Sequence, residues 1–390
     1  MTSLVNRILC RVSLSLITAA AVTTAAAQQS EIGPATDVQA QTHNKTKIAL
    51  IVSPKGSVLS EAAAPIQQGI LAASREATAS GACELIQYEL SSPQDAGAVL
   101  KKAADDGAVL AIGPVSRDAV QTISEMPYLP LPVVAINRPS GETAPELFLS
   151  IDISAESEVD QLAKIAVENT AQKTDLAANN FVILTTQDPY DERLARAMEA
   201  ALIKAGAGAE RRHISSDQIA YLRQEMRGKA FRGVFFAMNA QNASLLRPYL
   251  PPELPVFGTS YTNPMHQKDS MLAKTQANDL NGMITLEIPA EENASTLVAQ
   301  YKGDRENLSP EDLQMFSVGV DAWQLGTKWI DWARRIEVPN GLTGRLSFDK
   351  DNGSKVKREL VKTVVSPNKT GKTSEEDLVQ FTESAEEAGL

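Results

Sequence analysis

Histidine and cysteine are scarce in this sequence, and their positions exclude several kinds of active site. The 390 residues contain three histidines, His43, His213 and His266, and two cysteines, Cys10 and Cys83. No histidine lies in an HExxH pattern, and the chain has neither a Gly-x-Ser-x-Gly elbow nor a Walker A loop. Zinc sites need clustered cysteine and histidine ligands, so no metal is expected. No residue set indicates an enzyme, and no cofactor is expected.

Basic residues are fewer than acidic residues in this sequence. Forty-eight acidic residues outnumber 37 basic ones, which gives a net charge of −11. A chain of this charge repels polyanions, so nucleic acid and anionic membrane surfaces are not expected as partners. Hydrophobic residues make up 43% of the sequence. A chain of this length and composition can form two packed domains without disulfides.

The first residues have the pattern of a secretory signal peptide. Residues 1–27 contain two arginines, then a short apolar stretch and an Ala-x-Ala site, and residues 28–46 form a polar segment that we interpret as a flexible linker. Cleavage after residue 27 changes the net charge from −11 to −13 and leaves Cys83 as the one cysteine, which is expected to be buried. Cys10 lies too early for a lipid-attachment site. We therefore expect a periplasmic protein without a lipid anchor or membrane span.

Apolar runs and helical patterns alternate from Lys47 onward. Strands are predicted at 47–53, 83–90, 108–113 and 131–139, and again at 179–186, 210–215, 233–238 and 254–260, with a helical pattern between most neighbours. Such alternation indicates βαβ units and parallel sheets. The predicted fold class is therefore α/β, with two Rossmann-like lobes whose parallel central sheets flank a cleft.

The order of the segments suggests that the chain crosses between the lobes more than once. We assign 47–152 and 284–336 to lobe 1, 153–283 and 337–365 to lobe 2, and 366–390 to a flexible tail. Crossings are expected near 151–154, 280–283 and 337–341. Asp351-Asn352-Gly353 is typical of a turn between two antiparallel strands.

Polar residues follow several of the predicted strands. Ligands of parallel α/β sheets bind beyond the carboxyl ends of the strands. The candidate ligand-binding residues are Ser57, Ser116, Asn137, Tyr190 and Ser260. Three of them also have a structural interpretation: Ser116 can cap the next helix, Asn137 can hold its turn, and Asp188 beside Tyr190 can cap a helix. Their common position at one edge of the sheets supports a ligand site.

The tryptophans have a simpler interpretation. Trp323, Gly326 and Ile330 fall on one face of the predicted helix 312–335, and Trp329 and Trp332 lie close by. A stripe of apolar residues at this spacing is typical of core packing.

The order of motifs resembles the type I periplasmic-binding-protein fold, and more narrowly the LppC-like family of penicillin-binding-protein activators. The matching pieces are KIALIVSPKGSVLSEAAAPIQQGILAA, AVLAIGPVSRDAV, LPVVAINRP, FVILTTQDPYDERLARAM, GVFFAMNAQNASLLRPYL, LPVFGTSYTN, FSVGVDAWQL and GLTGRLSFDKDNG. They cover most of residues 47–360 in order. GLTGRLSFD is shared by many two-lobed binding proteins, whereas AQNASLLRPYL with LPVFGTS is more similar to the activators.

The resemblance implies a non-enzymatic periplasmic protein that stimulates a peptidoglycan synthase. Members of the family are usually outer-membrane lipoproteins with an extra N-terminal helical domain, and this chain departs from both features. The alternative is a solute-binding receptor of an ABC transporter for an amino acid or another small polar ligand, with an ABC permease as its partner. Ser116 and Tyr190 match the receptor pattern, although Arg117 and Asp118 stand where receptors carry further hydroxyl residues.

Overall fold

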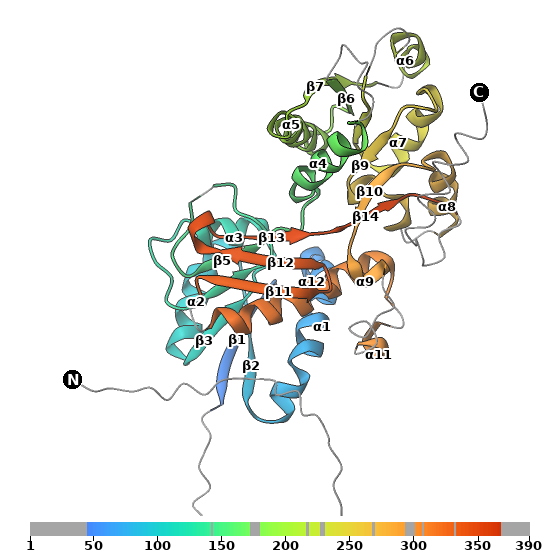
Figure 1. Ribbon diagram of the computed structural model, residues 1–390. Helices are drawn as coiled ribbons and strands as arrows, with labels where there is room; N and C mark the ends of the chain where they lie inside the picture. Colours follow the sequence, from blue (N-terminus) through green and yellow to red (C-terminus); the bar gives the residue numbers. More distant parts are fainter. Residues whose placement is uncertain are drawn as a thin grey trace, which may run out of the picture.

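The computed structural model describes most of the chain between Lys45 and Pro367. The described residues are 45–141, 143–171, 180–215, 218–226, 231–266, 270–292, 301–305, 308–330 and 333–367. The predicted signal peptide, nearly all of the predicted linker and most of the predicted tail lie outside them. The described chain forms two α/β lobes (Figure 1).

Lobe 1 is built on an eight-stranded sheet with the order β11-β12-β13-β5-β4-β3-β1-β2. Strands β1 to β5 and β13 run parallel to one another, and β11, β12 and β13 form an antiparallel ribbon. Its strands are β1 (Thr46–Val52), β2 (Cys83–Glu89), β3 (Ala108–Ile112), β4 (Val133–Ala135), β5 (Phe148–Ile151), β11 (Arg335–Gly341), β12 (Gly344–Asp349) and β13 (Lys355–Glu359). Its main helices are α1 (Val58–Ala79), α2 (Ala96–Asp105), α3 (Arg117–Ser124) and α12 (Pro310–Trp329).

Lobe 2 is built on a six-stranded sheet with the order β14-β10-β9-β8-β6-β7. All pairs are parallel except β10 with β14. Its strands are β6 (Asn180–Thr185), β7 (Gly208–His213), β8 (Val234–Ala237), β9 (Val256–Gly258), β10 (Ile284–Glu287) and β14 (Val361–Val364). Its helices are α4 (Val159–Asn169), α5 (Pro189–Lys204), α6 (Ile219–Met226), α7 (Ala240–Leu246) and α8 (Ser270–Asp279), and the short helices α9 (Pro289–Glu292) and α11 (Lys302–Arg305) follow β10.

The central strands β3, β4 and β8 are apolar along their whole length, as expected where helices cover both faces of a sheet. In β1, Ile48 and Leu50 join the cluster of α1 and α12, whereas Ala49 and Ile51 join the cluster of α2 and α3. Successive side chains of a strand point to opposite faces, so one run supplies two cores. The predicted α/β class with mostly parallel sheets is confirmed.

The predicted tryptophan face is also in the core. Trp323 and Trp329 are 7% and 2% exposed and belong to the cluster between α12 and the lobe 1 sheet. Trp329 packs edge-on against Phe348, and its Nε1 donates a hydrogen bond to the Leu147 carbonyl. Trp332 lies outside the described residues.

The observed sheets correct two of the predicted boundaries between the lobes. Residues 284–287 form β10 beside β9 in lobe 2, not in lobe 1, and residues 335–359 form the β11–β13 ribbon, which joins the lobe 1 sheet through β5. The crossings after β5, after β10 and at Leu360 are therefore the ones that connect the lobes, and 280–283 and 337–341 do not. An apolar run predicts a strand but carries no information about its hydrogen-bonding neighbour.

One residue separates the two sheets at the third crossing. Strand β13 ends at Glu359 in lobe 1 and β14 begins at Val361 in lobe 2, so the two follow one another as a nearly continuous ribbon (Figure 1). The Gln161 side chain of α4 binds both backbone groups of the intervening Leu360. Its Oε1 accepts from the Leu360 N–H at 3.0 Å, and its Nε2 donates to the Leu360 carbonyl at 2.6 Å.

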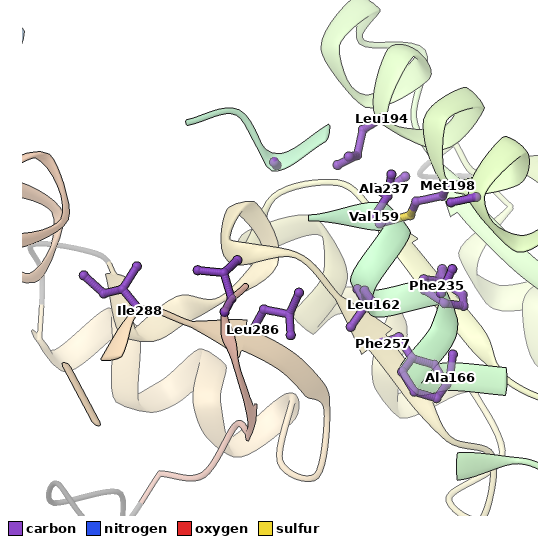
Figure 2. Packing of buried hydrophobic residues seen from close by; sticks show 14 of the residues in the cluster. Val159, Leu162, Ala166, Leu194, Met198, Phe235, Ala237, Phe257, Leu286 and Ile288 are labelled. Atoms are coloured by element: carbon purple, nitrogen blue, oxygen red, sulfur yellow. The ribbon is translucent and has the colours of Figure 1, made fainter. Parts of the chain in front are cut away.

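A continuous apolar cluster connects the core of lobe 2 to the crossings. Val159, Leu162 and Ala166 of α4 pack beside Phe235 and Phe257 (Figure 2). The same cluster extends along Leu286 of β10 and Ile288 of the second crossing to Leu360 of the third. It reaches lobe 1 at Phe316 of α12. The crossings are therefore packed in the hydrophobic core.

Two glycines set the distance between helices α1 and α12. A Cβ built on Gly69 would lie 2.0 Å from the Phe316 carbonyl oxygen, and a Cβ built on Gly319 would lie 2.0 Å from the Ile66 carbonyl oxygen. Both contacts are with backbone, so no side-chain rotation can relieve them. The helices are packed as closely as their backbones allow only because both positions lack a side chain.

We predict that Gly69→Ala and Gly319→Ala each lower the free energy of unfolding by about 3 kcal/mol, the upper part of the usual range for overpacking. Chemical denaturation of the purified variants measures this loss. Gly303→Ala in α11 is the matched control, because a Cβ there has no neighbour within 4 Å. Equal stability of the three variants would contradict the close helix contact.

Candidate functional site

The three lobe 1 candidates lie at the carboxyl ends of adjacent parallel strands, as predicted. Ser57 follows β1, Ser116 follows β3 and Asn137 follows β4. Ser57 caps α1 by accepting from the Ser60 N–H, and its Oγ donates to the Pro54 carbonyl. Ser116 caps α3 by accepting from the Ala119 N–H at 3.4 Å.

Asn137 ties two of these loops together. Its Nδ2 donates to the Val115 carbonyl at 3.2 Å, and its Oδ1 accepts from the Arg138 N–H at 2.9 Å. Arg138 in turn lies 3.5 Å from Asp152, the first residue of the crossing after β5. The loops after β3 and β4 are therefore fixed to each other and to the crossing.

Tyr190 of lobe 2 packs in an aromatic and charged cluster. Its ring meets Tyr261 edge-on at 4.8 Å between centroids, and the Arg193 guanidinium lies 5.1 Å from its ring centre. Burial raises the pKa of Tyr190, and the nearby Glu156 carboxylate raises it further. Burial likewise raises the pKa of Tyr261 to about 12, with a contribution from Asp191. Both phenols are therefore neutral at physiological pH.

Ser260 is held by a buried carboxylate that the sequence did not single out. Glu158, just before α4, is 3% exposed, and it accepts from the Ser260 N–H at 2.8 Å and from the Ser260 Oγ at 2.5 Å. Burial raises the pKa of Glu158, whereas the Arg358 guanidinium and the two Ser260 donors oppose that rise. Both donors of Ser260 are therefore committed to a partner in the same lobe.

A small cavity lies where the three crossings meet. It has a volume of about 20 Å³, and Glu158, Ser260 and Arg358 are among its polar walls. The apolar walls include Ile153 of the first crossing and Ile288 of the second. Arg358 donates to Ser157 at 3.4 Å, but its buried Nε has no hydrogen-bond partner. A cavity of this size has room for about one water molecule.

A second buried carboxylate connects lobe 2 to α12. Glu287, at the end of β10, accepts from the Asn263 Nδ2, and its Oε2 lies 2.8 Å from His266 Nε2. Gln314 of α12 places its Nε2 3.0 Å from the same imidazole nitrogen. The lobes are therefore joined by polar contacts beside the crossings as well as by the chain itself.

Asp321 fixes the turn of the β11–β12 ribbon to α12. Its Oδ1 accepts from the Leu342 N–H, and its Oδ2 accepts from the N–H and the Oγ1 of Thr343. The side chain is fully buried, and this burial raises its pKa to about 6 despite the three hydrogen bonds.

The structure groups the candidates within each lobe. Asn137 contacts the residue before Ser116, and Tyr190 contacts the residue after Ser260. No hydrogen bond or ring contact joins the lobe 1 set to the lobe 2 set within the described residues. Ligand binding by the five residues stays a prediction.

Sequence reasoning missed Glu156, Glu158 and Arg358. The two acids stand in a segment, SAESE, whose composition is typical of an exposed helix start, and Arg358 belongs to the charged run KVKRE. No local pattern marks Glu156 and Glu158 as buried or Arg358 as partly buried, because this burial depends on where the crossings meet.

No cluster of three or more histidine, cysteine, aspartate or glutamate side chains suited to a metal occurs among the described residues. Within the same residues, no helix combines the length and the apolar character that a membrane span requires.

Ser260→Ala is predicted to lower the free energy of unfolding by about 2 kcal/mol at pH 7, because it removes a hydrogen bond to a buried carboxylate. The control is Ser244→Ala, whose buried hydroxyl donates to the neutral Gln241 carbonyl at 2.9 Å. That variant is expected to lose less than about 1 kcal/mol. Denaturant unfolding measures both, and equal losses would refute the role of Glu158.

Asp321 is predicted to make stability fall as the pH rises. Its pKa is about 6 in the folded chain against an ordinary value of 3.8, so the folded state binds a proton that the unfolded state has released. This stabilisation is fully present below pH 3.8 and is lost as the pH rises to about 6, with a slope of up to about 1.4 kcal/mol per unit. Unfolding of the wild type and of Asp321→Asn at pH 4 to 7 tests it: the difference between them must change with pH. A constant difference would contradict it.

Solved structures of two kinds are similar to this chain. A candidate branched-chain amino acid ABC transporter protein from Chromobacterium violaceum has 23% identity and a TM-score of 0.66, and the match covers 82% of this chain and 100% of that one. The C-domain of LpoA from Haemophilus influenzae, a regulator of PBP1A, has 18% identity and a TM-score of 0.64 over 84% and 98% of the two chains. The match covers 58% of full-length LpoA, again at 18% identity, with a TM-score of 0.66.

No family model matches the sequence. No curated protein matches it either. Identities in this range establish shared architecture rather than shared activity. Both kinds of neighbour have two α/β lobes of the same type, which agrees with the sheets described above. The chain therefore has the type I periplasmic-binding-protein fold, as the sequence predicted.

Proposed function

We propose that this chain is a non-enzymatic, exported regulator that binds a peptidoglycan synthase of the penicillin-binding-protein type. The solved neighbours include both a regulator of PBP1A and a candidate ABC transporter protein, with TM-scores of 0.64 and 0.66, and neither likeness decides between the two functions. The choice between the two functions therefore depends on the chemistry of the predicted cleft.

The single observation that supports the proposal is that four of the five candidate residues already form hydrogen bonds within the chain. Ser57 and Ser116 cap helices, Asn137 uses both ends of its amide on backbone partners, and Ser260 gives both donors to Glu158. A receptor needs convergent polar groups that a ligand can engage. A small polar ligand here would compete with bonds that the chain already makes.

The cavity at the crossings gives the same indication. At about 20 Å³ it is far below the several hundred cubic ångströms of ordinary small-molecule sites. Arg117, beside Ser116, is exposed and occupies a position where receptors carry small hydroxyl residues. We infer that the two lobes present a surface that binds another protein and do not close on a small solute.

One observation favours the alternative, a solute receptor of an ABC transporter. Glu156 is 7% exposed, its Oε1 lies 3.7 Å from Arg193, and its buried Oε2 has no hydrogen-bond partner. A buried carboxylate oxygen without a donor is costly. An ammonium group that entered beside Tyr190 would satisfy it.

The test uses the chain from residue 28 and a purified bifunctional synthase from the organism that encodes it. We expect saturable binding in biolayer interferometry and a several-fold rise in the transpeptidase rate. In parallel, amino acids, short peptides and organic acids are screened by thermal shift. A ligand at 100 times its dissociation constant would add about 2.7 kcal/mol and raise the melting temperature by several degrees. We expect no such shift.

Ser116→Arg and Tyr190→Ala distinguish the two functions. Under the regulator proposal, both variants keep their binding to the synthase as long as they fold. A melting-temperature shift that one solute produces in the wild type, and that both variants lose, would establish the receptor function. Absence of synthase binding together with such a shift overturns the proposal.

A further inference from the structure

A groove in lobe 2 lies at the edge of the sheet opposite to the candidate residues. Its volume is about 340 Å³, and its walls are Arg223, Arg247, Pro248, Leu250, Pro252, Asp279 and Asn281. These residues come from the segments that lead into β8, β9 and β10. They therefore lie at the amino ends of these strands, whereas Tyr190 and Ser260 follow the carboxyl ends of β6 and β9.

Two arginines of the groove lack a carboxylate partner. Most described arginines lie within 4 Å of an aspartate or glutamate oxygen, namely Arg75, Arg138, Arg193, Arg196, Arg211, Arg212, Arg334, Arg335 and Arg345. Among the described residues, Arg223 and Arg247 have no such contact, although acidic residues outnumber basic ones in the sequence. Two unneutralised guanidinium groups therefore share one groove.

Hydrogen bonds to backbone fix the orientation of both guanidinium groups. Arg223 Nη2 donates to the Pro248 carbonyl at 2.8 Å. Arg247 Nη1 and Nη2 donate to the carbonyls of Pro251 and Pro252 at 3.4 and 3.2 Å. A guanidinium carries five N–H donors, so each retains donors after these bonds. The groups are oriented in advance without being neutralised.

Arg247 is also partly buried, which makes the missing counter-charge significant. Burial lowers its pKa, and Glu253 opposes this only from a distance. Asp279 lines the groove, but it lies beyond ion-pair distance of either arginine. Removing a cation from water without a partner is unfavourable, and an anion in the groove would relieve this.

We propose that this groove binds an organic oxyanion, a carboxylate or phosphate attached to an apolar group. The planar donor forks of Arg223 and Arg247 suit the two oxygens of such an anion. Pro248 and Pro252 provide an apolar wall for the rest of the ligand, and Asn281 adds an amide at the rim. This site is separate from the proposed regulator function and from the predicted cleft.

Phenyl phosphate, benzoate and inorganic phosphate are the probes, titrated against the full chain by isothermal titration calorimetry. We expect saturable binding of phenyl phosphate or benzoate that is tighter than that of inorganic phosphate and weakens with added salt. Arg223→Gln, at an exposed position, is expected to weaken binding about tenfold, the effect of losing one hydrogen bond to a charged group.

Asp279→Asn tests whether electrostatic attraction drives the binding of the anion. It removes the acidic side chain of the groove and should tighten binding about threefold. Arg334→Gln, at an exposed arginine of lobe 1 paired with Asp351, is the matched control and should change nothing. Absence of saturable binding overturns the proposal. So does binding that none of the groove variants alters, or inorganic phosphate binding as tightly as phenyl phosphate.

Discussion

The close contact of α1 with α12 is the constraint on which the arrangement of the rest depends. Gly69 and Gly319 bring the two backbones into contact, and this places α12 against both the lobe 1 sheet and the crossings. Helix α12 then delivers Phe316 to the apolar cluster of lobe 2, Gln314 to His266, and Asp321 to the turn of the ribbon. A helix held further away would meet none of these partners.

Buried charge surrounds the crossings for a related reason. Glu158, Glu287 and Asp321 are nearly inaccessible to solvent, and each accepts hydrogen bonds from a different segment. An apolar core could fill the same volume, but it would not specify which loop meets which helix. Hydrogen bonds to buried carboxylates are directional, so they fix the path of a chain that crosses three times between the lobes.

Most of the local structure was predictable from the sequence, and the long-range pairing was not. Caps such as Ser116 and Asp188 were visible because a capping side chain acts within three residues of itself. Strand β11 was missed because RIEVPNG follows a long helical pattern and has a proline near its end. Strand β10 and the β11–β13 ribbon were assigned to the wrong lobes. Their pairing with β9 and with β5 joins segments that lie far apart in the sequence, and no local pattern encodes it. Likewise, the positions of Ser57 and Tyr190 followed from the strand ends, whereas Glu158 and Arg358 become neighbours only once the crossings meet.

The Gln161 amide has a mechanical consequence. It occupies the place of a neighbouring strand for one residue, since it satisfies both backbone groups of Leu360 where the ribbon leaves one sheet for the other. Helix α4 begins just after the first crossing, so this side chain fastens the first connection between the lobes to the third. The first and third connections between the lobes are therefore coupled at this point and must move together. Rotation of one lobe against the other must carry α4 with the ribbon, or else expose an unpaired peptide group.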